Sequence, residues 1–125
     1  MSWHRHVFDF KLLFTLREEA MTLVSKIITG ASFDLVAQLI DILDDASEVE
    51  KKLAAFEKKD PTHFKSVIYG YLLDVERNPE PREKDYKAFV KGYEETLAWF
   101  ARAKHEIKKY VATRHTRSNP RKKKR

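Results

Sequence analysis

The side chains best suited to binding chemistry in this 125-residue sequence are cations gathered in its last 24 residues. Residues 102–125 contain 11 Lys and Arg and one Glu, whereas the other 101 residues contain 14 Lys and Arg and 18 Asp and Glu. Such a cluster binds phosphates with an affinity that falls steeply as salt rises. We expect a nucleic-acid backbone to bind Arg5 and the cations near the end of the sequence, which are Lys108, Lys109, Arg114, Arg117, Arg121, Lys122, Lys123, Lys124 and Arg125.

These cations have no arrangement suited to reading base edges. Contacts with phosphates position a protein on nucleic acid but carry no sequence information. We therefore expect sequence-independent binding, with double-stranded DNA as the favoured partner. Two other interpretations stay open, because a lysine-rich segment can simply keep a protein soluble, and PRKKKR at residues 120–125 is similar to a nuclear import sequence.

Aromatic and cationic side chains alternate near the other end of the sequence. Residues 3–8 read WHRHVF and precede the first apolar repeat. Rings and cations in alternation suit a nucleic acid or a groove on a neighbouring subunit. We expect residues 1–8 to form an arm that Trp3 and Phe8 anchor on such a partner. The alternative is that both rings pack on their own bundle.

Carboxylates gather in the middle of the sequence. Asp41, Asp44, Asp45 and Glu48 are spaced so that most pairs lie three or four residues apart, in a segment (34–50) that contains no Lys or Arg. Acid-base catalysis would need burial or a partner that separates their pKa values. One interpretation is a solvated helix face. We also expect the three Asp residues to receive basic groups from another subunit, which would promote assembly.

Patterns typical of catalytic or metal sites do not stand out. The five His residues are not spaced as zinc ligands, and the sequence contains no Cys. No glycine-rich phosphate loop or nucleophile elbow is visible. We therefore expect a protein that is not an enzyme and that holds no metal or cofactor. No run approaches about 18 uncharged apolar residues, so we expect no membrane partner.

Helices must position these side chains, and the apolar spacing predicts helices along most of the sequence. Residues 9–28 repeat apolar side chains at intervals of three and four. Ser32 is suited to cap a second helix. Ser47 and Glu50 have the spacing of a capping box, which predicts a break near Ala46 and a short third helix.

The second half of the sequence contains clearer boundaries. Asp60 before Pro61 predicts a helix start, because Asp can cap the helix and proline needs no hydrogen-bond donor there. Two prolines in RNPEPR predict a loop at residues 77–82. Residues 83–112 then follow an apolar heptad seam that only Lys104 interrupts, which predicts a long last helix whose final turns project from the body.

The sequence as a whole predicts an all-α fold, a four- or five-helix bundle with a long C-terminal helix and a basic tail. We expect an arm at residues 1–8, a bundle at 9–112 and a tail at 113–125. In size, helical content, lack of Cys and basic character, the chain resembles the major coat proteins of filamentous viruses of hyperthermophilic archaea. That resemblance implies helical bundles that pair and wrap linear double-stranded DNA in a protein sheath.

The DNA-wrapping elements of that family lie largely toward the N-terminal side, whereas the charge here lies at residues 102–125. The resemblance therefore assigns no binding residue in this sequence. We expect a protein that packages nucleic acid by assembling with copies of itself or a paralogous subunit, located in a virion if it is a coat protein and otherwise in the cytoplasm or nucleus. The alternatives are a small helical subunit of a ribonucleoprotein, such as a CRISPR effector complex or a ribosome, and an adaptor whose tail is an import sequence.

Overall fold

The computed structural model describes the backbone at residues 2–30 and 33–118 and the side chains at residues 6–30 and 33–112. In chain order the elements are the helices α1 (Ser2–Gly30), α2 (Phe33–Lys59), α3 (Pro61–Asp74) and α4 (Glu83–Ser118). The described residues contain no strand, so the all-α bundle predicted from the sequence is confirmed. None of the described helices is long and apolar enough to cross a membrane.

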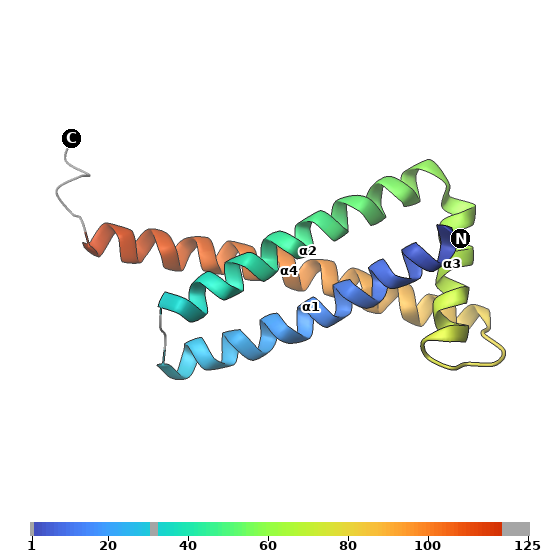
Figure 1. The fold of residues 1–125 in the computed structure, drawn as a ribbon, viewed down its shortest axis with the longest axis horizontal. Coiled ribbons are helices and arrows are strands. Elements are labelled where there is room, and N and C mark those ends of the chain that lie inside the picture. Colours follow the sequence, from blue (N-terminus) through green and yellow to red (C-terminus); the bar gives the residue numbers. More distant parts are fainter. Residues whose placement is uncertain (1, 31–32, 119–125) are drawn as a thin grey trace.

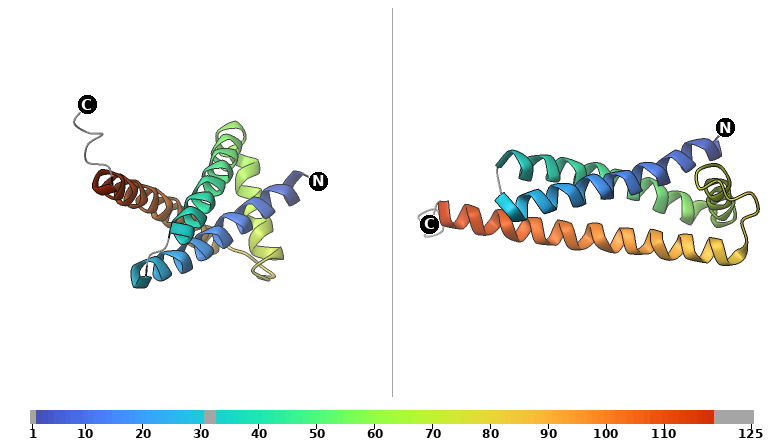
Figure 2. Two further views of the ribbon diagram at one scale, coloured as in Figure 1. Left: turned by 60° about the vertical axis from the view of Figure 1, so that its left-hand side comes forward. Right: turned by 90° about the horizontal axis from the view of Figure 1, so that it is seen from below.

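The bundle is built on a hairpin of α1 and α2 (Figure 1). The short helix α3 crosses one end of this hairpin, and α4 then runs back along the hairpin toward the α1–α2 turn. With 36 residues, α4 is about 54 Å long at about 1.5 Å per residue. Its last turns extend beyond the α1–α2 turn in two views (Figures 1 and 2), as the sequence predicts.

A cluster of aromatic rings forms the core where α1, α3 and α4 meet. Phe10 is fully buried, and its ring centroid lies between 5.1 and 6.2 Å from four other rings. Tilted and edge-on ring pairs of this kind add to the energy of burial. The four rings come from α3 and α4 and belong to Phe64, Tyr71, Phe89 and Tyr93.

Capping hydrogen bonds define the start of α3 and the start of α4. The carboxylate of Asp60 accepts a hydrogen bond of 3.1 Å from the backbone N–H of His63, and Pro61 opens the helix. The predicted start of α3 is therefore confirmed. At the start of α4, the Asp85 carboxylate accepts a bond of 2.9 Å from the backbone N–H of Arg82. This bond, together with one from the Asn78 side chain, holds the pKa of Asp85 below its usual value.

The predicted break near Ala46 is wrong, because α2 runs unbroken from Phe33 to Lys59. Ala46 is fully buried, and Val49 and Leu53 continue the same buried face. Continuous packing of this face therefore outweighs the local capping preference of Ser47. The predicted second and third helices are one helix, and the bundle has four helices within the described residues.

The expected boundaries of the bundle also differ from those in the structure. Helix α1 begins at Ser2, so the backbone of residues 2–8 belongs to this helix, and Val7 is buried at 8% exposure. Helix α4 extends to Ser118, beyond the expected limit at residue 112. Helical backbone therefore reaches into the segment that we expected to be tail.

Candidate nucleic-acid interface

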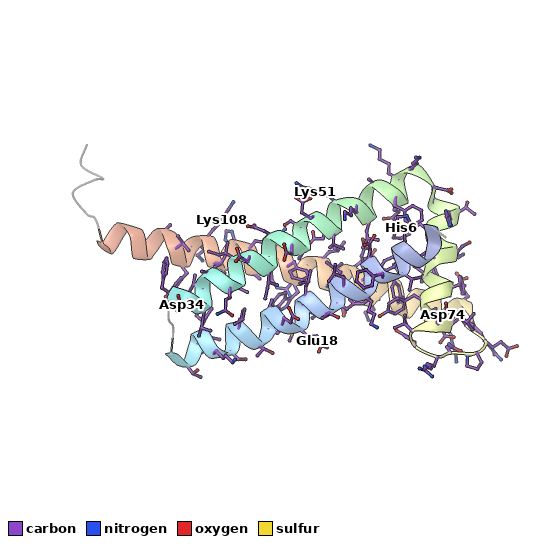
Figure 3. All side chains as sticks on the ribbon, in the orientation of Figure 1. His6, Glu18, Asp34, Lys51, Asp74 and Lys108 are labelled. Atoms are coloured by element: carbon purple, nitrogen blue, oxygen red, sulfur yellow. The ribbon has the colours of Figure 1, made fainter. Side chains whose placement is uncertain are left out.

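The cations of α4 from residue 102 onward whose side chains are described form two rows. Arg102 and Lys109 are seven residues apart and exposed, so they lie on the same outer side of the helix. Lys104 and Lys108 are four residues apart and line a groove between α4 and α2. Figure 3 shows Lys108 on α4 beside the N-terminal half of α2. The two rows therefore have different surroundings, and only the outer row faces away from α2.

The outer row is open to an approaching phosphate backbone. Lys109 Nζ lies 3.9 Å from a carboxylate oxygen of Glu106, and both side chains are more than 60% exposed. An ion pair so exposed to water contributes little and does not hold the lysine in place. Arg102 and Lys109 are therefore both exposed to solvent, and the expected role of Lys109 in binding nucleic acid stays a prediction.

Lys104, which interrupts the apolar seam of α4, lies near enough to Glu50 on α2 to act on its charge. Burial raises the pKa of Glu50 above its usual value, and the positive charge of Lys104 partly offsets that effect. Oε2 of Glu50 is buried without a hydrogen-bond partner in the described part of the chain. Lys104 therefore compensates a charge within the bundle.

The acidic residues of α2 lie beside this basic helix. Asp41, Asp44 and Asp45 are all exposed, and Asp44 lines the same groove as Lys104 and Lys108. None of the three Asp residues has an ion-pair partner within 4.0 Å among the described side chains. Their assignment to a subunit interface stays a prediction. Negative charge on these residues would repel an anion on this side of α4, whereas the outer row faces away from them.

The structure places the first residues of α1 far from the last residues of α4. The start of α1 and the end of α4 lie at opposite ends of the molecule (Figure 1), so Arg5 is far from the basic end of α4 within one chain. The side chains of Trp3, Arg5, Arg114 and Arg117 lie outside the described residues. So do the remaining expected binding residues, which are Arg121, Lys122, Lys123, Lys124 and Arg125.

Residues 6–8 show two different surroundings. The ring of His6 stacks on Phe56 at a centroid distance of 3.9 Å, and Nδ1 of His6 lies 3.5 Å from a carboxylate oxygen of buried Asp9. His6 and Val7 therefore pack on their own bundle. Phe8 is 60% exposed. Its expected role as an anchor on a partner stays a prediction.

Polar and aromatic contacts that the sequence did not indicate hold α4 against α1. Arg17 donates a hydrogen bond of 3.0 Å to Oγ1 of Thr96, and its guanidinium lies 5.9 Å from the ring centroid of Trp99. Thr96 is 1% exposed. Arg17 lies at the spacing of the apolar side chains of α1, four residues after Leu13, but Thr96 lies outside the heptad seam of α4, so the sequence pattern does not indicate the pair.

The described residues contain no group of three or more His, Asp or Glu side chains placed to hold a metal ion. The described side chains at the C-terminal part of α4 offer electrostatic binding by separate cations. Comparison of the chain with known protein families, with curated proteins and with solved structures finds no match.

Proposed function

We propose that this chain is a non-enzymatic protein that binds nucleic acid without sequence specificity and packages it by assembling with further copies, as the coat protein of a filamentous virus would. The observation that carries this proposal is the concentration of positive charge in the sequence from residue 102, within α4, onward. Residues 102–125 hold 11 of the 25 Lys and Arg and one of the 19 Asp and Glu. Double-stranded DNA is the partner that we favour.

The proposed contact runs along the outer side of α4. Arg102 and Lys109 are exposed there, whereas the carboxylates of α2 lie on the other side of the helix. Each phosphate that a cation neutralises releases counterions and adds about 0.9 to the slope of log affinity against log salt. Because Lys104 and Lys108 lie on the side of α4 that faces α2, we assign the phosphate contacts to Arg102 and Lys109.

Deletion of residues 114–125 tests the main source of charge. The deletion removes seven of the 25 Lys and Arg, so the slope of log affinity for duplex DNA against log salt should fall by up to about 6. Fluorescence anisotropy at several salt concentrations measures this slope. An unchanged slope would place the binding surface on the bundle and contradict the proposed role of the tail.

A pair of substitutions tests the outer row of α4 within the full chain. Arg102→Gln with Lys109→Gln should lower the slope by about 2, because two phosphate contacts are lost. The matched control is Lys51→Gln with Lys52→Gln, which removes the same charge from exposed positions on α2. Equal effects of the two pairs would show that net charge alone, and not a surface on α4, governs binding.

The same measurements separate the two alternative functions. A ribonucleoprotein subunit should prefer RNA and bind in few copies per nucleic-acid molecule, whereas a packaging protein should cover duplex DNA along its length. An adaptor with an import sequence should show no salt-dependent binding to DNA. Sedimentation of the complexes at saturation gives the number of copies bound.

A further inference from the structure

A groove between α2 and α4 remains open on the side of the bundle where the acidic and basic residues meet. Its volume is about 520 Å³. The apolar side chains in it come from both helices, and one of them, Val111, is 41% exposed. The groove is lined by Ile40, Leu43, Asp44, Lys104, Ile107, Lys108, Val111 and Ala112.

The apolar surface continues from this groove along α2. Phe33 lies two helical turns before Ile40 and therefore on the same side of the helix. The Phe33 side chain is 82% exposed, which is the highest exposure among the large apolar residues described. An apolar surface with a ring at its edge is typical of a protein-protein contact.

The charges beside the groove are of opposite sign on its two sides. Asp44 on α2 and Lys108 on α4 are exposed, and neither forms an ion pair within 4.0 Å in the described part of the chain. A twofold rotation about an axis that runs along the groove, in the plane of contact between two copies, exchanges its two sides. It therefore places the acidic side of one copy over the basic side of the other, so the surface is complementary to itself.

From this self-complementarity we infer that the groove between α2 and α4 is a twofold interface between two copies of this chain, in which Asp44 of each copy faces Lys108 of the other. The inference rests on the assembly part of the proposed function and names its contact. In the dimer, Ile40, Ile107 and Val111 lose contact with water. A nucleic acid fits this groove poorly, because Asp44 would repel its phosphates.

Charge exchange at one pair of residues tests this interface. Sedimentation of the full chain without nucleic acid should show a dimer. Asp44→Lys and Lys108→Asp each place like charges opposite each other twice, so each variant alone should dimerise at least about tenfold more weakly. A one-to-one mixture of the two variants should form a heterodimer, because both contacts between unlike chains are then attractive.

The mixture distinguishes contacts between copies from contacts within one chain. A charge pair within one chain would stay disrupted in both variants after mixing, whereas a twofold contact is restored. Asp45→Lys is the matched control for the acidic change, since Asp45 is exposed on α2 but does not line the groove. This control should dimerise like the unaltered chain.

Three results would overturn the inference. They are a monomeric full chain at millimolar concentration, dimerisation of Asp44→Lys equal to that of Asp45→Lys, and failure of the two groove variants to combine. Anisotropy with duplex DNA, measured on Asp44→Lys, separates this inference from the proposed function. If Asp44→Lys binds DNA in a salt-dependent way but the unaltered full chain forms no dimer, the proposed binding of nucleic acid stands. The proposed twofold interface is then wrong.

Discussion

The two ends of the bundle differ in what their apolar side chains do. At the end where α3 crosses, Phe10 is fully buried among rings from α3 and α4. At the α1–α2 turn, Ile28 and Phe33 are 78% and 82% exposed. The first end has a complete core, whereas the second presents apolar and cationic side chains to solvent. The difference indicates that the first end stabilises the fold, and we propose that the second end contacts partners.

The largest effect on stability should follow from a change at the end where α3 crosses the bundle. Phe10→Ala removes the central ring of the aromatic cluster and should lower the free energy of unfolding by about 3 to 5 kcal/mol. Chemical denaturation followed by circular dichroism measures this loss. A loss below about 1 kcal/mol would show that the aromatic cluster does not hold the bundle together.

A change at the end with the α1–α2 turn should weaken association between copies and leave the stability of the monomer almost unchanged. Phe33→Ser alters a side chain that is 82% exposed, so the free energy of unfolding of the monomer should change by at most about 0.5 kcal/mol. Association of copies should weaken, because the apolar edge of the groove is lost. Denaturation at low concentration and sedimentation at high concentration measure the two quantities. A strongly destabilised monomer would contradict the division between the two ends.

A third, small effect concerns Glu50, which lies in α2 between the two ends. Burial raises its pKa, so the folded state favours the protonated form, and stability falls as pH rises through the raised pKa. Glu50→Gln should therefore stabilise the chain at neutral pH, by less than about 1 kcal/mol because the side chain is only partly buried. The gain should vanish below the usual pKa of Glu. A loss of stability at neutral pH would show that the attraction to Lys104 outweighs the burial of Glu50.

Local sequence signals predicted the elements that local interactions determine. Asp60 and Pro61 start α3 as expected, since capping depends on neighbouring residues alone. The break near Ala46 was wrongly predicted, because whether a capping box forms depends on the surface that the helix packs against. That surface belongs to a distant part of the sequence and is not visible in a local pattern.

The candidate site could be predicted only in part. Charge composition identified the basic end of α4 without any structure. It could not assign Lys104 to Glu50 and Lys109 to the outer side, because those surroundings depend on how α4 packs on α2. The contact of Arg17 with Thr96 joins residues 79 positions apart, and no spacing rule indicates such a pair.

Electron microscopy of the purified full chain, with and without linear double-stranded DNA at low salt, tests the central claim most directly. The account predicts regular assemblies in which protein covers the DNA along its length, and their loss at high salt as counterions compete for the phosphates. Bare DNA beside unassembled protein at low salt would contradict it.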